Sequence, residues 1–139
     1  MKKVFNLTIS VFLILAGACY AQEISYGGNW TMTCKGKASN YFGVVSHVDF
    51  SHKILIHDWE ATSNLDLSLS QTDPGGYQGT GYIFGAPVGA HFRYEYMDMY
   101  YVEGYVKVKK NSMKATVAFV LLYTEEGFGF GTCGLKRDR

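Results

Sequence analysis

The sequence predicts an all-β fold: an up-and-down antiparallel meander of eight to ten strands, closed as a small barrel and stapled by one disulfide. Three observations predict it. Apolar and polar residues alternate with period two through most of the chain after residue 21, turn-forming residues separate these runs at even intervals, and one cysteine lies near each end of that segment. Period-two alternation is typical of strands with one buried face, and short turns between evenly spaced strands favour a meander.

Four runs show the alternation most clearly, and each is expected to form a strand. In Leu65–Ser70 a leucine alternates with Asp or Ser, and similar patterns occupy Trp30–Lys35, Val102–Lys109 and Met113–Phe119. The continuation from Phe119 to Tyr123 is apolar throughout. A strand that is apolar on both faces is usually buried on both faces, so this continuation is expected to be the most deeply buried part of the sheet.

Clusters of turn-forming residues mark the expected connections between these strands, and no window has a clear helical periodicity. The clusters are Ser51–Lys53, Ala61–Asn64, Asp73–Gly76, Lys110–Ser112 and Glu125–Gly127.

Two cysteines lie after residue 21. Cys34 is on the first expected strand and Cys133 is on the last. In an oxidising compartment two such thiols are expected to pair, and the bond requires their strands to be neighbours. A meander whose first and last strands touch is a closed barrel, which leaves no exposed sheet edge. Closing a loop of this length is expected to stabilise the fold by about 4–5 kcal/mol.

Residues 1–21 have the pattern of a secretory signal peptide. A positively charged start precedes the apolar run Val4–Ala18, and Ala21 offers a small residue at the expected cleavage site. The apolar run is too short for a transmembrane helix. We therefore expect one domain, residues 22–139, in the periplasm or outside the cell, with no integral membrane segment after cleavage.

An alternative is a lipoprotein anchored through Cys19, because Ala16–Cys19 resembles the bacterial lipobox, although Ala16 stands where leucine is usual. Cleavage after Ala21 removes Cys19 and leaves an even number of cysteines. Cysteine parity therefore favours cleavage after Ala21.

Charge and motifs narrow the classes of function. The chain has 13 Lys and Arg against 12 Asp and Glu, and loss of Lys2 and Lys3 with the leader changes the formal net charge from +1 to −1. Such a balance lacks the electrostatic footprint of a nucleic-acid-binding protein. No nucleophile elbow, cysteine–histidine pair, carboxylate dyad or phosphate loop stands out. Neither enzymatic activity nor a cofactor is expected.

Gly28-Asn29-Trp30, at the start of the first expected strand, resembles the G-x-W motif of the calycins, the lipocalin- and avidin-type barrels. The resemblance implies that Trp30 closes one end of the barrel. It also implies that a basic side chain from the last strand, Lys136 or Arg137, packs across the indole ring.

The candidate ligand-binding residues are Trp30, Tyr94, Tyr96 and Tyr101. Tyrosine combines an aromatic face with a polar tip, which suits the wall of a ligand cavity and equally a protein-binding surface. The expected function is an exported barrel that holds a small apolar or aromatic ligand. The alternative is a protein-binding module, such as an inhibitor of an extracytoplasmic hydrolase or a surface interaction protein.

His47 and His57 are the candidate metal ligands. If Ser51–Lys53 is a hairpin loop, these histidines lie opposite each other on two strands, near enough to share a metal ion. No third ligand is evident, so no metal site is predicted and a polar outer face is preferred. The same register places Asp58 opposite Ser46 with inward parity, where it needs a partner or lies in water beyond the rim.

Overall fold

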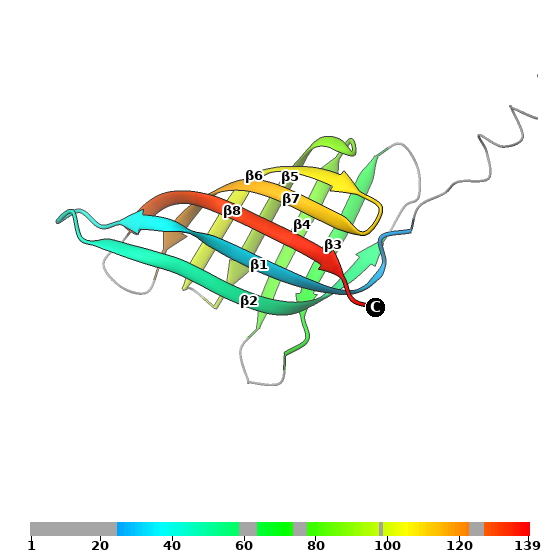
Figure 1. Cartoon of the computed structure of the whole chain (residues 1–139), viewed down its shortest axis with the longest axis horizontal. Helices are drawn as coiled ribbons and strands as arrows, with labels where there is room; N and C mark the ends of the chain where they lie inside the picture. The colour runs from blue at the N-terminus through cyan, green and yellow to red at the C-terminus, as the bar shows by residue number, and fades with distance from the viewer. Residues whose placement is uncertain (1–24, 59–63, 74–77, 98, 123–126) are drawn as a thin grey trace, which may run out of the picture.

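Eight antiparallel strands form a closed barrel in the computed structural model of the protein (Figure 1). The structure describes residues 25–58, 64–73, 78–97, 99–122 and 127–139, and the predicted signal peptide with Cys19 lies outside them. The strands are β1 (Gly28–Ser39), β2 (Val45–Asp58), β3 (Leu65–Gln71), β4 (Gly79–Gly85), β5 (Val88–Tyr96), β6 (Tyr100–Lys109), β7 (Ser112–Leu121) and β8 (Gly127–Arg137). Each strand pairs with the next, and β8 pairs with β1, which confirms the predicted fold class.

The disulfide lies where β8 closes onto β1. Cys34 and Cys133 are direct cross-strand partners, with their Cα atoms 4.1 Å apart, and they are bonded. Both side chains are fully buried. The bond therefore links strands that are already neighbours and makes the ring of eight strands covalent.

One end of the barrel is built around Trp30, which is fully buried and donates from Nε1 to the backbone oxygen of Tyr26 at 2.8 Å. The Cζ atom of Arg137, the cross-strand partner of Trp30, lies 4.7 Å from the indole centroid. The guanidinium also donates to two backbone oxygens of the segment before β1, at 2.9 and 2.5 Å. Arg137, and not Lys136, therefore packs across the indole ring. We call this the tryptophan end and the opposite end the tyrosine end.

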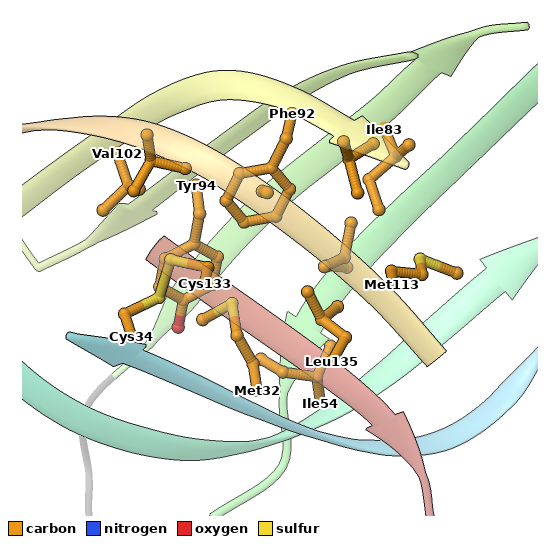
Figure 2. Close-up of a cluster of buried hydrophobic side chains, with 14 of the residues drawn as sticks. Met32, Cys34, Ile54, Ile83, Phe92, Tyr94, Val102, Met113, Cys133 and Leu135 are labelled. Atoms are coloured by element: carbon orange, nitrogen blue, oxygen red, sulfur yellow. A yellow bond between two sulfur atoms is a disulfide. The ribbon is translucent and has the colours of Figure 1, made fainter. Parts of the chain in front are cut away.

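Inward-facing side chains fill the middle of the barrel. The largest fully buried ones are Trp30, Tyr94, Phe92 and Phe119. Figure 2 shows Phe92 and Tyr94 with the disulfide among aliphatic and methionine side chains from several strands. The alternation that predicted the strands thus also supplies the apolar interior.

Inward-facing glycines make room for two of these rings. A Cβ atom on Gly36 or on Gly131 would lie 2.4 Å from the ring of Phe119. A Cβ atom on Gly79 would lie 2.1 Å from the hydroxyl oxygen of Tyr94. Because these distances are shorter than any ordinary carbon contact, only glycine lets the aromatic rings lie against the inner wall.

The turn predicted at Ser51–Lys53 is wrong, because this segment is the middle of the continuous strand β2. His52 consequently faces inward on the same side as Ile54, and Phe50 does not pair with Ile54. The segment has no Gly, Pro or Asn to stabilise a turn. Extended pairing with residues 31–33 of β1 satisfies its backbone instead.

The metal geometry predicted for His47 and His57 is also wrong. Both lie on β2, ten residues and roughly 33 Å apart. The cross-strand partner of His47 is Lys37, and that of His57 is Ser68. Within the residues that the structure describes, no group of three or more His, Cys, Asp or Glu side chains could hold a metal ion.

Asp58 ends β2 at the tryptophan end and has a partner. Its Oδ2 accepts a hydrogen bond from the backbone N–H of Tyr26 at 2.9 Å, in a partly buried position. Its cross-strand partner is Leu67, and the predicted pairing with Ser46 is wrong because Ser46 pairs with Ala38. Asp58 thus fixes the chain that enters β1, close to Trp30.

The deep burial predicted for Phe119–Tyr123 is found only on the inner face of the barrel wall. Phe119 and Leu121 are buried, but Val120 is half-buried and Leu122 is 45 % exposed, while Tyr123 lies outside the described residues. A single-layer barrel has no second layer to cover the outer face of β7, so the outward apolar residues remain at the surface.

Candidate functional site

Side chains from four segments gather inside the barrel at its tyrosine end, where β3 and β5 end and β6 begins. We call this group the mouth cluster. Its members are Phe50 and His52 from β2, Gln71 at the end of β3 with Asp73 just beyond it, Tyr94 and Tyr96 from β5, and Tyr100 from β6.

Aromatic rings line the mouth cluster. Phe50 stacks on Tyr100 with ring centroids 5.0 Å apart and planes at 22°. Tyr96 stacks on Tyr100 at 6.3 Å and lies against the imidazole of His52 at 4.6 Å. These rings pack against one another and give the cluster an apolar, aromatic wall.

Polar atoms without partners are concentrated among these rings. His52 Nδ1 lies 3.2 Å from Gln71 Nε2 and 3.6 Å from Asp73 Oδ2. Three buried atoms of the cluster, His52 Nε2, Gln71 Oε1 and Tyr94 Oη, have no hydrogen-bond partner within the described chain. An unpaired buried polar group costs about 1–3 kcal/mol, so each of these atoms requires a partner that the described residues do not supply.

Burial favours the neutral forms of Tyr94 and His52. It raises the pKa of the Tyr94 hydroxyl far above its usual range, with smaller contributions from Tyr96 and Asp73. Burial also lowers the pKa of His52, although the Asp73 carboxylate opposes the shift. At neutral pH the cluster therefore offers a protonated phenol and an uncharged imidazole.

This arrangement defines the chemistry that the cluster can recognise. When the Gln71 amide donates to His52 Nδ1, the neutral ring carries its proton on Nε2. Nε2–H is then a donor, Gln71 Oε1 is an acceptor, and the Tyr94 hydroxyl can serve as either. A hydroxyl, an amide or a protonated carboxyl group, each of which both donates and accepts, would satisfy these atoms.

The lowered pKa of His52 predicts a loss of stability in mild acid. Because the folded chain binds this proton less readily than the unfolded chain, the free energy of unfolding falls as the pH drops below 6.5 toward the folded-state pKa. The expected loss is up to about 1.4 kcal/mol per pH unit in that window. Urea unfolding at several pH values should show this loss in the wild type and in His47→Gln, which changes an exposed histidine of β2. In His52→Gln the loss should disappear, and an unchanged pH dependence there would contradict the assignment.

The structure brings together only two of the four predicted ligand-binding residues. Tyr94 and Tyr96 lie in the mouth cluster, whereas Trp30 is buried near the opposite end. Tyr101 is on the outer face, where its hydroxyl donates to Glu103 and Arg93 Cζ lies 5.4 Å from its ring centroid.

Tyr101 belongs to a second group of side chains, on the outside of β4, β5 and β6. Glu103 holds this group together: its Oε1 is 2.8 Å from His91 Nε2, and its Oε2 is 3.8 Å from Arg93. The hydrogen bond from Tyr101 lowers the pKa of Glu103 most strongly, and the two basic neighbours add to the effect. We call this surface, which consists of Tyr82, Phe84, His91, Arg93, Tyr101, Glu103 and Tyr105, the outer aromatic face.

The fold and the mouth cluster define a small, disulfide-closed β-barrel with a group of polar and aromatic side chains at one end. Neither a family model, nor a curated protein, nor a solved structure matches the chain. No helix in the described part of the chain is long and apolar enough to cross a membrane.

Proposed function

We propose that this protein is an exported binding barrel, and not an enzyme, that holds a small apolar or aromatic ligand at its tyrosine end. The observation that carries the proposal is the group of three partnerless polar atoms, on His52, Gln71 and Tyr94, set among stacked aromatic rings. A ligand with an aromatic body and one hydroxyl, amide or protonated carboxyl group would satisfy both features.

Calycin-like architecture supports this proposal. The calycin resemblance rests on the G-x-W tripeptide that ends in Trp30, and the closed eight-stranded barrel is compatible with it. Arg137 occupies the place on the last strand from which a basic group is expected to cover the indole ring. With the tryptophan end covered in this way, the proposal places ligand entry at the tyrosine end.

Export is supported by the disulfide together with the predicted signal peptide. The bond between Cys34 and Cys133 requires an oxidising compartment in which to persist. The periplasm or the cell exterior meets that requirement.

The proposed site predicts a large effect on binding and a small effect on stability for one double variant, Gln71→Leu with Tyr94→Phe. Loss of two hydrogen bonds is expected to weaken binding of 2-naphthol, an aromatic probe with one hydroxyl group, about tenfold or more. Removal of two unpaired buried atoms favours the folded protein, while loss of the bond from Gln71 to His52 Nδ1 opposes it, so the free energy of unfolding is expected to change by less than about 1 kcal/mol. Fluorescence titration and urea unfolding measure the two quantities.

Tyr101→Phe is the matched control, because it removes a tyrosine hydroxyl from the outer aromatic face. It should bind the probe as tightly as the wild type does. The proposed site is wrong if the double variant retains full affinity while Tyr101→Phe loses it.

The outer aromatic face favours a second candidate function, binding of another protein. Tyr105 is 70 % exposed and Phe84 is 50 % exposed, and both rings pack against His91. Exposed aromatic side chains held on a rigid sheet are typical of protein interfaces. If this candidate is correct, an extracytoplasmic protein captured by the wild type is lost with Phe84→Ala plus Tyr105→Ala and is retained with Tyr94→Phe. Capture that is equal in all three proteins argues against it.

A further inference from the structure

A groove of about 680 Å³ crosses the outside of the barrel at the tryptophan end, over β6, β7, β8 and β1. Most of its lining residues face outward, the core residues Met113 and Leu135 also contribute to the lining, and none of its lining residues belongs to the mouth cluster. Four lysines line it: Lys107 and Lys109 from β6, Lys114 from β7, and Lys136 from β8.

Strand register sets these lysines in two parallel rows. In each row the residues are successive cross-strand partners on neighbouring strands, so their outward side chains stand side by side. The first row is Lys107, Lys114, Gly134 and Thr33, and the second is Lys109, Ser112, Lys136 and Thr31. Gly134 has open space where a side chain would be, so it forms the floor of the groove between the flanking residues.

The positive charge of the groove is uncompensated. None of the four lysines forms an ion pair with any residue that the structure describes, and no carboxylate lines the groove. Strands β1, β7 and β8 contain no Asp or Glu. Lys107 and Lys114 are directly opposite each other, an arrangement of like charges that destabilises a sheet.

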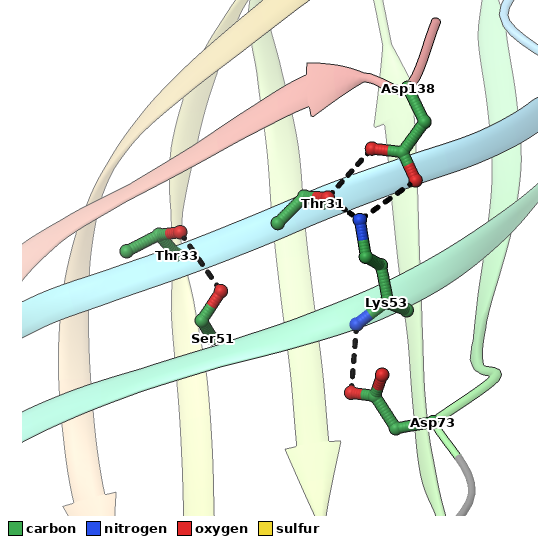
Figure 3. Close-up of polar contacts among 6 residues, drawn as sticks. All are labelled: Thr31, Thr33, Ser51, Lys53, Asp73 and Asp138. Carbon is green, nitrogen blue, oxygen red and sulfur yellow. Dashed lines mark hydrogen bonds and ion pairs between the residues drawn. The ribbon is translucent and has the colours of Figure 1, made fainter.

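The acidic group at the edge of the groove is already engaged. Asp138 accepts from the hydroxyl of Thr31 at 2.7 Å and from the ammonium of Lys53 at 3.1 Å (Figure 3). These two donors lower the pKa of its carboxyl group, so Asp138 stays ionised and paired with a lysine outside the groove. It therefore leaves the four groove lysines unneutralised.

The spacing of the rows indicates the size of a complementary ligand. Adjacent strands are about 4.8 Å apart and alternate residues along a strand are about 6.7 Å apart, so the two rows span roughly 14 Å by 7 Å. Hydroxyl groups of Thr31, Thr33 and Ser112 lie between or beside the lysines and can donate to ester oxygens. A single small anion would contact only part of this surface.

We propose that the groove is a second binding site, for a ligand of about disaccharide size that carries two or more phosphate or sulfate ester groups. Lysine ammonium groups bind such anions as point charges, and the neighbouring hydroxyls supply oriented donors. The like-charge pair of Lys107 and Lys114, unfavourable in the free protein, becomes favourable once an anion lies over it.

The test is calorimetric titration at about 0.15 M salt, where nonspecific surface attraction is largely screened. Sucrose octasulfate is the soluble probe, and vesicles containing phosphatidylglycerol test a lipid headgroup as the source of the anion. The variant Lys114→Gln with Lys136→Gln removes one charge from each row. The matched control, Lys35→Gln with Lys37→Gln, removes two exposed lysines of β1 outside the groove.

We expect the groove variant to bind the probe at least tenfold more weakly and the control to bind within twofold of the wild type. The groove variant should melt at the same temperature as the wild type or higher, because it relieves a like-charge pair. Vesicle binding that is lost only in the groove variant would place the phosphate on a lipid headgroup. Failure to bind either probe, equal weakening in both variants, or equally tight binding of inorganic phosphate would overturn the proposal.

Discussion

Replacing both cysteines, as Cys34→Ala with Cys133→Ala, is expected to lower the free energy of unfolding by about 3–5 kcal/mol. The bond joins residues that are 99 apart in sequence. A link across roughly 100 residues restricts the unfolded chain by about 4.7 kcal/mol in the chain-entropy treatment. Because the cysteines are direct partners in an existing strand pair, the folded barrel should keep its shape without the bond. Urea unfolding of the oxidised wild type and of the variant measures the difference.

Reduction of the wild type supplies the control for this prediction, since it breaks the same bond without replacing the cysteine side chains by alanine. The reduced protein should unfold at a urea concentration close to that of the double variant. The bond in the oxidised wild type is first verified by mass mapping. If the free energy of unfolding of this protein then exceeds that of the reduced protein and of the double variant by less than about 1 kcal/mol, the expected stabilisation is contradicted.

Trp30→Ala is expected to lower the free energy of unfolding by about 3–5 kcal/mol, as large-to-small changes of buried aromatic residues do. The indole is fully buried, its N–H donates to the Tyr26 backbone, and Arg137 stacks on its face. Truncation leaves a cavity and an unpaired carbonyl oxygen, and it removes the surface on which the guanidinium rests. Equilibrium unfolding in urea measures the loss.

Two further variants separate these contributions. Trp30→Phe keeps an aromatic ring under Arg137 but deletes the N–H donor, so a smaller loss of about 1–2 kcal/mol is expected. Tyr105→Ala removes a ring that is 70 % exposed and should change stability by less than about 0.5 kcal/mol. Equal losses for Trp30→Ala and Tyr105→Ala would mean that the tryptophan end does not stabilise the barrel.

The sequence carries enough information to predict the barrel, because its strands follow from local alternation and its closure from one pair of cysteines. Alternation identifies the strands, and the positions of Cys34 and Cys133 specify that the first and last strands meet. The main error in the fold arose at Ser51–Lys53, where a polar tripeptide resembles a turn. Only pairing with β1 shows that β2 continues through it, and pairing partners cannot be deduced from one segment alone.

The mouth cluster was only half predictable, for a related reason. Tyr94 and Tyr96 are alternate residues of one strand, so period-two alternation places both on the same face. His52 was missed because it was assigned to a loop. Gln71 was missed because it ends the alternating leucines of β3 without any unusual pattern. The parity of Phe50, Ile54 and Ile56 would have placed His52 inward if β2 had been taken as one strand.

The direction of Tyr101 and the grouping of the groove lysines depend on structure in a different way. In the β5–β6 pair, Tyr94 lies opposite Val102, and Tyr101 lies opposite Glu95. Tyr101 therefore faces outward, and only the strand register shows this. The four lysines lie on three strands, and their cross-strand pairing brings them together although the net charge of the whole chain is close to zero. The overall amino-acid composition therefore does not reveal the local excess of positive charge in the groove.

Native mass spectrometry of the protein, purified without denaturation from the extracytoplasmic fraction of the cells that produce it, tests the proposed function most directly. The wild type and Tyr101→Phe should carry a small molecule that Gln71→Leu with Tyr94→Phe does not retain. A wild type whose mass corresponds to the unliganded chain in every preparation, or a bound molecule that persists in the double variant, would contradict a ligand site at the tyrosine end.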